Sequence, residues 1–333
     1  MSYAQGHGPD HRASRKALPH VHPSPARRDA VSPSATPSAA ELAERYGLTP
    51  SSARPSLFAY VRQLWERRYF IGTYATSRSV TKYSKSFLGQ VWFVLTPLLN
   101  AGVYLLIFGL ILNTDRGVPN YLVFLVTGVF VMSYTQSSVT SAARSISGNL
   151  SLIRALHFPR AALPLSTTLV ELRQVMFSMG LLLLIVLVTP VHLIGDEPMQ
   201  APEPLTAAWL LLIPALFLQT MFNAGLGFII ARIGAAVTDI QQLLPFVLRT
   251  WLYASGVIFP IEFRLKEANV PQWVIDLLMA NPAAVYIEII RDALMESHTA
   301  PSFAWPLAVA WAVVMFVVGF TFFWAAEEKY GRG

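Results

Sequence analysis

Hydroxyl-bearing side chains recur at helical spacing in one segment that is otherwise apolar. The segment is uncharged up to Arg144, and the face concerned carries Tyr134, Ser137, Ser138, Ser141 and Ser145. Such a face can hydrogen-bond an uncharged, hydroxyl-rich cargo such as a sugar. Small hydroxyl residues also let two helices approach and bond across their interface. The sequence supports both roles about equally.

Aromatic side chains offer a second surface for the same cargo, because an aromatic ring can stack on the apolar face of a sugar ring. Tyr104 and Phe108 are four residues apart in one apolar segment, and further aromatics stand at Trp92, Trp251 and Tyr253. Trp and Tyr also collect at both membrane–water interfaces without any ligand. For each residue taken singly, that interfacial role is the commoner one.

Three ionisable side chains fall within apolar segments: Glu171, Arg173 and Arg249. Charges at such positions are costly and point to functional sites. Glu171 and Arg173 are two residues apart on a helix and do not face each other, whereas Glu171 and Arg249 can pair between helices. One acid with two bases makes a poor proton relay, so we expect structural pairing or a water-filled cavity rather than ion coupling.

These residues need membrane-spanning helices to position them. With both termini in the cytoplasm, 19 Lys and Arg residues lie inside and four outside, which is the arrangement that the positive-inside rule favours. We therefore predict an all-α, multi-pass protein of the plasma membrane with both termini cytoplasmic. Six segments are long enough to cross about 30 Å of hydrocarbon: Leu88–Leu112, Tyr121–Ile146, Ala162–Thr189, Leu205–Ala231, Leu243–Phe259 and Ser302–Ala326.

Between the fifth and sixth segments, two apolar stretches meet at Asn281-Pro282. Stretches of about a dozen residues are too short to span a bilayer and are typical of re-entrant helices. Proline disfavours a helical conformation for the residue before it, so the break should fall at Asn281. We predict a re-entrant helical hairpin in which Glu288, Arg291 and Asp292 pair with one another or face water.

The N-terminal part divides into two regions. Residues 1–54 hold seven of the 23 prolines and little apolar surface, which predicts a disordered cytoplasmic tail. Residues 55–87 begin with an apolar stripe opposite charged residues and end in a basic run. The stripe predicts a helix lying in the membrane interface, although a helix packed on a soluble neighbour has the same pattern. Its residues are Phe58, Val61, Trp65 and Tyr69, and the basic run contains Lys82, Tyr83 and Lys85.

The composition agrees with a membrane protein. The chain is 54% hydrophobic and 13% charged, whereas soluble domains carry about 25% charged residues. Thirteen of the 25 Lys and Arg residues precede Leu88, so juxtamembrane anchoring explains the basic charge and no nucleic acid is required. The chain has no Cys, which excludes disulfides, thiol catalysis and cysteine-bound metals.

Motifs for catalysis are absent from the sequence. It contains no GxxxxGK[ST] loop, no HExxH, no GxSxG and no His cluster with metal-ligand spacing. We therefore predict no catalytic residue, metal or cofactor on this chain. Any ATP hydrolysis would need a separate subunit.

The loop GNLSLIRALHFPR, residues 148–160, has the pattern of a short amphipathic helix. Asn149 can cap its start, and Pro159 should stop it. Its apolar side chains would fit a groove on a cytoplasmic partner or lie flat on anionic lipid. The candidate docking residues are Asn149, Leu152, Ile153, Arg154, Leu156, His157, Phe158 and Arg160.

Three stretches, taken in order, resemble the membrane subunits of type-2 ABC exporters for polysaccharides: YSKSFLGQVWFVLTPLL, NLSLIRALHFPR and VPQWVIDLLMANPAAVYIEIIRDAL. The resemblance implies an ABC-2 type transmembrane domain over residues 88–333. It also implies a homodimeric permease with two copies of a separate ATPase subunit, which would bind ATP and Mg²⁺. The loop at 148–160 would then be the coupling helix to that subunit.

The same resemblance implies a polysaccharide cargo carried on a polyprenyl-pyrophosphate lipid. Lys82, Tyr83 and Lys85 would form the gate for that lipid. The glycan channel would include Trp92, Tyr104, Phe108, Tyr134, Ser137, Ser138, Ser141, Trp251 and Tyr253.

One departure from the family pattern is Thr238-Asp239, where the family often has Arg-Asp, so we assign no charge pair there. The Arg- and Ala-rich composition is typical of GC-rich genomes and, by analogy, suggests a cell-wall galactan as cargo. Two alternatives stay open. One is an ion-coupled secondary carrier, which would need Glu171 or Asp239 to titrate, and the other is a membrane-embedded glycosyl- or acyltransferase.

Overall fold

The computed structural model describes residues 42, 45–46, 55–82, 86–112, 118–156, 158–191 and 200–330. The chain divides into two units, Met1–Ser51 and Ser52–Gly333, and the account below concerns the second. The predicted disordered tail lies almost wholly outside the described residues and stays a prediction.

Within the described residues, five helices are long and apolar enough to cross a membrane. Each agrees with a predicted span to within five residues at either end. They are Gly89–Ile111, Tyr121–Ala143, Ala162–Val188, Ala207–Ala236 and Ala304–Trp324. The all-α membrane fold is therefore confirmed.

The elements that make up these spans are mostly regular α-helices. Departures occur in the first span, which contains Pro97 and continues as a π-helix, and in the fourth, which opens with a 3₁₀ turn. The spans consist of η1 (Gly89–Val91), α4 (Trp92–Tyr104) and η2 (Leu105–Ile111), then α5 (Tyr121–Ala143), α7 (Ala162–Val188), η4 (Ala207–Leu211) with α8 (Leu212–Ala236), and α13 (Ala304–Trp324).

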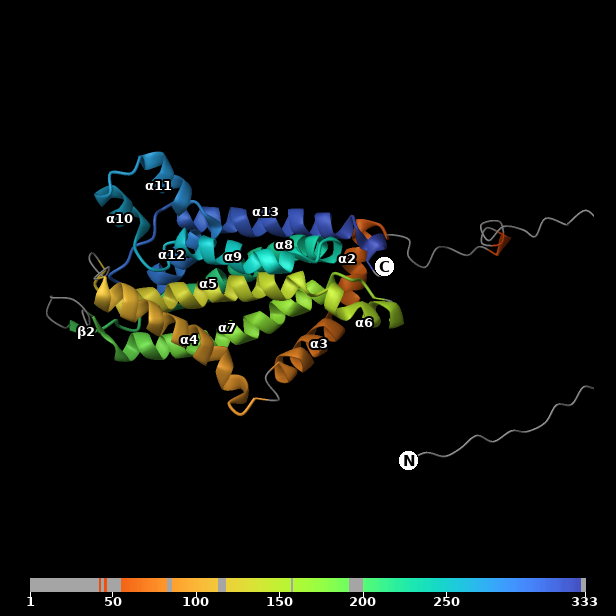
Figure 1. The fold of residues 1–333 in the computed structure, drawn as a ribbon, viewed down its shortest axis with the longest axis horizontal. Coiled ribbons are helices and arrows are strands. Elements are labelled where there is room, and N and C mark those ends of the chain that lie inside the picture. The colour runs from red at the N-terminus through yellow and green to blue at the C-terminus, as the bar shows by residue number, and fades with distance from the viewer. Residues whose placement is uncertain are drawn as a thin grey trace, which may run out of the picture. The chain divides into compact units, whose positions relative to one another are not determined.

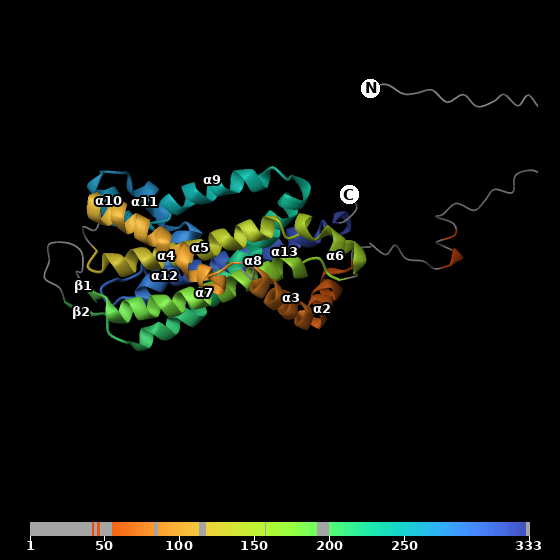
Figure 2. The ribbon, with the colours of Figure 1, turned by 60° about the horizontal axis from the view of Figure 1, so that its bottom comes forward.

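The segment predicted as the fifth span is a shorter helix, α9 (Ile240–Tyr253), of 14 residues. At about 1.5 Å per residue it extends about 21 Å. The chain then turns sharply at Gly256, whose φ of +66° is accessible to glycine. Figure 2 shows α5 flanked by α4 and α9 on one side of the bundle.

The predicted re-entrant hairpin is present as two helices bent by 75°, α11 (Gln272–Met279) and α12 (Pro282–Leu294). The break falls at Asn281, as predicted, because Pro282 opens the second helix. The Oδ1 atom of Asn281 accepts a hydrogen bond of 3.0 Å from the backbone N–H of Ala283 and so caps α12.

Short elements cover the two ends of the bundle (Figure 1). The α6 end comprises α2 (Leu57–Glu66), α3 (Arg68–Thr81), η3 (Ser147–Asn149), α6 (Leu150–Ala155) and η5 (Glu327–Lys329). The α11 end comprises α11, α10 (Ile261–Glu267) and the antiparallel pair of β1 (Pro190–Val191) and β2 (Gln200–Pro202). The C-terminus thus lies at the same end as the predicted coupling loop, which the predicted orientation requires.

Helix α5 is the centre of the fold, since it packs against α4, α7, α8, α9 and α12. Its first half, from Val123 to Met132, is buried on all sides. Because every face of this half is buried, its sequence is apolar on all sides and shows no amphipathic stripe.

A buried arginine joins α12 to this centre. Arg291 is fully buried and pairs with Glu288 at 3.1 Å. Its guanidinium donates hydrogen bonds to the backbone carbonyls of Phe124 (3.0 and 3.3 Å), Gly256 (3.0 Å) and Val257 (3.2 Å). The expected pairing of Glu288 with Arg291 is confirmed.

The interface helix α2 meets the bundle through one buried side chain. Tyr60 donates to Glu327 Oε2 at 2.7 Å and accepts from the Ala161 N–H at 3.0 Å. Arg160 donates its backbone N–H to Glu327 Oε1 at 3.0 Å, and burial raises the pKa of the Glu327 carboxyl. The predicted stripe, Phe58, Val61, Trp65 and Tyr69, is exposed, as expected for a surface that faces lipid.

Helices α8 and α13 approach most closely at a pair of glycines, Gly225 and Gly319. A Cβ atom built on Gly319 would lie 2.0 Å from the backbone oxygen of Gly225, and one on Gly225 would lie 2.3 Å from the backbone of Met315. Such close backbone approach is how transmembrane helices gain packing energy.

We expect Gly319→Ala to destabilise the protein by at least about 1–3 kcal/mol, because the added methyl forces α8 and α13 apart. The matched control is Gly180→Ala in α7, where a Cβ meets nothing within 4 Å and alanine favours the helix. The measurement is the midpoint of thermal unfolding in detergent. Equal midpoints for the two variants would contradict the assigned packing.

Candidate functional site: a charged gate and a polar groove

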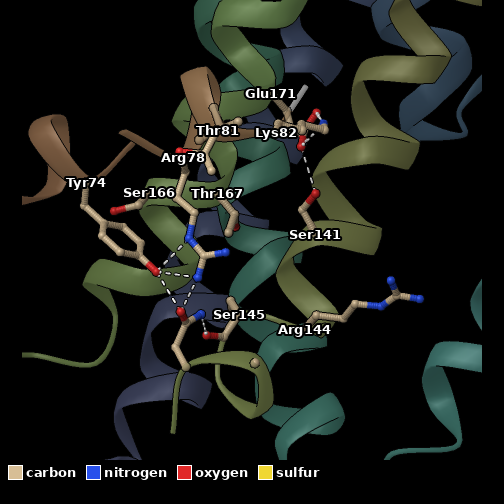
Figure 3. Close-up of a pocket in the computed structure, with 13 residues that line it drawn as sticks. Tyr74, Arg78, Thr81, Lys82, Ser141, Arg144, Ser145, Ser166, Thr167 and Glu171 are labelled. Carbon is tan, nitrogen blue, oxygen red and sulfur yellow. Dashed lines mark hydrogen bonds and ion pairs between the residues drawn. The ribbon is translucent and has the colours of Figure 1, made fainter. Parts of the chain in front are cut away.

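An ion pair links the end of α3 to the third span, α7. Lys82 follows the last residue of α3, and its Nζ donates to both carboxylate oxygens of Glu171 in α7, at 2.9 and 3.0 Å. The Oγ of Ser141 donates to Glu171 Oε1 at 2.8 Å, and Gln174 Oε1 accepts from Lys82 at 3.2 Å. Figure 3 shows Lys82, Glu171 and Ser141 turned toward one another.

The two partners differ in exposure. The Glu171 side chain is 2% exposed, whereas that of Lys82 is 32% exposed. The proposed pairing of Glu171 with Arg249 is therefore wrong, because the acid already binds a cation from α3. Ionisable groups in a membrane segment need such a partner.

One cavity, which we call the inner pocket, lies beside this pair at the α6 end and has a volume of about 410 Å³. Figure 3 shows the guanidinium of Arg78 turned toward Tyr74 and that of Arg144 turned away from both. The two arginines therefore do not converge on one point. The pocket is lined by Tyr74, Arg78, Thr81, Lys82, Ser141, Arg144, Ser145, Gly148, Asn149, Ser166, Thr167, Val170 and Glu171.

A second cavity, the polar groove, has a volume of about 500 Å³ and lies between α4, α5 and α9. Lys82 and Ser141 belong to both cavities, so the ion pair stands where the two meet. The groove is lined by Lys82, Asn100, Tyr104, Gln136, Ser137, Thr140, Ser141, Pro245, Leu248, Arg249 and Leu252.

The structure brings only part of the predicted channel set to the groove, namely Tyr104, Ser137 and Ser141. Phe108 lies edge-on to Tyr104 at 6.3 Å between ring centroids. Trp92 is partly buried and Tyr253 is exposed, and neither lines either cavity.

Three predicted channel residues instead pack between helices. Tyr134 donates to Thr220 Oγ1 in α8 at 2.9 Å, and Ser138 is fully buried. The indole N–H of Trp251 donates to Asn281 Oδ1 at 2.7 Å. The hydroxyl-rich face is thus divided: Tyr134 and Ser138 pack between helices, whereas Ser137 and Ser141 line the groove.

Sequence reasoning missed several groove residues. Asn100, Gln136 and Thr140 each place a polar side chain in an apolar span, which is the signal that could have identified them. Gln136 also donates to the Leu248 carbonyl at 2.9 Å and so connects α5 to α9. Arg249 was recognised as a charge in a span that could pair with Glu171 or face a water-filled cavity, and it lines the groove.

The predicted docking loop forms η3 and α6, and its residues divide by exposure. Ile153 is buried, and Leu152 and Phe158 are partly buried against the bundle. Arg154 and Leu156 are exposed, together with Leu150, which sequence reasoning missed. Arg160 binds Glu327 instead. Of the apolar side chains expected to dock, Leu152 and Ile153 therefore face inward, and Leu156 faces outward.

Asn149 occupies the N-cap position of α6, but its side chain makes no capping bond, so that prediction was wrong. Its Oδ1 accepts from the Tyr74 hydroxyl at 2.7 Å and from Arg78, and its Nδ2 donates to the Ser145 carbonyl at 2.7 Å. Tyr83 and Lys85 of the predicted gate and His157 of the loop lie outside the described residues.

Residues 73–295 match the family described as ABC-2 type transporter. That region contains both cavities, α6 and the bent hairpin. The chain belongs to the ABC-2 type transporter family. This confirms the resemblance drawn from the three sequence stretches.

Among relatives of this ABC-2 chain, an O-antigen export system permease protein of Myxococcus xanthus is 26% identical over 272 residues, or 81% of this chain and 94% of the relative. One from Klebsiella pneumoniae is 27% identical and covers 64% of this chain and 75% of the relative. A polysialic acid transport protein of Escherichia coli is 22% identical and covers 74% and 90%.

The ion pair can be tested by a double-mutant cycle. We expect Lys82→Ala to lower the free energy of unfolding by about 1–3 kcal/mol, because it leaves the buried Glu171 carboxylate without its cation. Adding Glu171→Gln should recover most of that loss, since the neutral amide needs no counter-charge. The measurement is again the thermal midpoint in detergent.

The matched control is Lys266→Ala, which removes an exposed lysine from its pair with Glu262 and should change stability by less than about 1 kcal/mol. Additive effects of the two substitutions at 82 and 171 would show that the pair contributes nothing.

Proposed function

We propose that this chain is the permease subunit of an ATP-driven exporter that moves a polysaccharide, linked to polyprenyl pyrophosphate, out across the plasma membrane. Family membership supports the transport class, and the relatives named for O-antigen and polysialic acid support a polysaccharide cargo. A cell-wall galactan is the specific cargo we favour, by analogy from composition.

The polar groove is the observation that carries this proposal. Asn100 and Arg249 are exposed in it, yet it lies along helices that are otherwise apolar enough for lipid. Polar side chains turned toward hydrocarbon are costly. A second copy of the chain, placed against α4 and α9, would cover them and enclose a path lined by hydroxyl, amide and aromatic groups.

Such a path suits an uncharged glycan. Hydroxyl and amide groups such as Ser137, Thr140 and Gln136 exchange hydrogen bonds with sugar hydroxyls at little net cost, and Tyr104 offers a ring face. Because the pair of Lys82 with Glu171 stands where this path meets the inner pocket, it would act as the gate. An arriving pyrophosphate would compete with Glu171 for the Lys82 ammonium.

Energy would come from a partner. Two copies of a separate ATPase subunit, carrying ATP and Mg²⁺, would dock against the exposed side of α6, where Leu150, Arg154 and Leu156 face outward. With α6 and the C-terminus on the cytoplasmic side, this subunit would meet the chain inside the cell.

The dimer can be tested by cross-linking, because the chain has no native Cys. We expect copies carrying Leu99→Cys in α4 to cross-link in membranes to copies carrying Phe246→Cys in α9, since both residues are exposed beside the groove. Val313→Cys on α13, also exposed, is the control and should give no dimer with either. Cross-linking only through position 313 would place the dimer interface elsewhere and contradict an enclosed groove.

Transport can be tested in inside-out vesicles with a polyprenyl-pyrophosphate-linked galactan. The chain alone should hydrolyse no ATP, and uptake should appear only with the ATPase subunit. Lys82→Glu with Lys85→Glu should lower uptake by roughly tenfold or more, because a charge-assisted hydrogen bond contributes about 1.5–3 kcal/mol, while membrane insertion stays normal.

If uptake and membrane insertion fell equally in that variant, the two lysines would serve only to anchor the chain at the membrane. Uptake by the chain without any ATPase, driven by a proton gradient and abolished by Glu171→Gln, would instead identify a secondary carrier.

A further inference from the structure

Helix α3 contacts both flanks of α6. Before α6, the Asn149 Oδ1 accepts from Tyr74 and Arg78 of α3. After α6, the ring of Phe158 lies against Phe70 of α3, with 5.3 Å between centroids. If α6 moves, its flanking residues therefore press on α3 at two separate points.

The residues of α3 that make these contacts also bind one another. The Arg78 guanidinium donates to the Tyr74 hydroxyl at 2.8 and 3.0 Å, and it lies 5.3 Å from the centre of that ring. Tyr74 also stacks on Phe70, with 5.8 Å between centroids. Three successive turns of α3 thus form one surface that fits the flanks of α6.

The opposite end of α3 holds the gate. The helix is continuous over 14 residues, Arg68–Thr81, and the Lys82 N–H still bonds to the Arg78 carbonyl at 3.0 Å. Tyr74 and Lys82 are about 12 Å apart along the axis at about 1.5 Å per residue. A helix of this length moves as a rigid body, so what shifts Tyr74 also shifts Lys82.

We propose that α3 is a lever that transmits movement of α6 to the pair of Lys82 with Glu171, and that Asn149 is its joint with α6. This inference rests on the proposed function, because an ATPase subunit must move α6. Asn149, Tyr74 and Arg78 would act as positioning residues, since their side chains bind one another between α3 and the start of α6. Displacement of the lever would withdraw Lys82 from Glu171 and open the meeting point of the inner pocket and the polar groove.

A second route for the same movement exists, because α6 is joined through the chain to α5 and α7. The two routes differ in what breaks them. Removing the side chain of Asn149 breaks the joint with α3 and leaves the chain continuous. The variants below therefore separate transmission through side chains from transmission along the backbone.

The test uses the full chain with its ATPase subunits in lipid nanodiscs and one introduced cysteine, Thr81→Cys. This position is exposed and lines the inner pocket beside Lys82, and the chain has no other Cys. The measurement is the rate at which a charged maleimide modifies the cysteine, with and without ATP and Mg²⁺. We expect nucleotide to change that rate by about tenfold, within the usual range for coupled sites.

Adding Asn149→Ala should reduce this response to about twofold or less. Tyr74→Phe removes one donor and keeps the ring contacts, so its response should be intermediate. Ser151→Ala is the matched control, because Ser151 is exposed on α6 and outside the joint, and its response should stay full.

Equal responses with and without Asn149→Ala would overturn the proposal, because Asn149 would then not be the joint between α6 and α3. An assembled complex that hydrolyses ATP without any response at position 81 would overturn it as well, and leave the proposed function standing. Failure of any ATPase subunit to bind would instead overturn the proposed function, and the lever with it.

Discussion

The structure depends on one constraint, which is that charged groups within apolar spans must find partners inside the protein. Each buried charge follows it. Glu171 binds Lys82 and Ser141, and Arg291 binds Glu288 and backbone carbonyls from two other segments. The constraint also explains why the polar groove matters. It is the place where exposed polar side chains line a cavity between apolar helices, and such a surface needs a cover that one chain does not supply.

The same constraint decides what the sequence could predict. Spans follow from the length of an apolar run, which is a local property of the sequence. The ends of five spans were therefore predicted to within five residues. The break before α12 was also local, because Pro282 acts on Asn281 alone. By contrast, α9 came out shorter than expected, since an apolar run does not show where the chain will turn, and here it turns at Gly256.

The candidate site was predictable only in part, because its contacts are set by helices distant in sequence. The hydroxyl-rich face of α5 was recognised, but a face of one helix is shared among several neighbours. Ser137 and Ser141 meet the groove, whereas Tyr134 and Ser138 meet α8. Glu171 was recognised as needing a partner, and Arg249 was the wrong choice because the end of an interface helix reaches into the bundle. Nothing in the local pattern around Lys82 indicates that reach.

Two of the ion pairs in the described residues, Lys82 with Glu171 and Arg291 with Glu288, differ in how far their members are enclosed. Arg291 is enclosed completely and holds at least four partners, so moving it would break several hydrogen bonds at once. Lys82 keeps about a third of its side chain exposed, where the inner pocket meets the groove, and its acid has a second donor in Ser141. Glu171 therefore keeps a hydrogen bond when the lysine leaves. An ion pair with one partly exposed member can separate at moderate cost. A fully enclosed ion pair instead keeps the helices that it joins in place. The first would suit the proposed gate, and the second fixes α12 to α5.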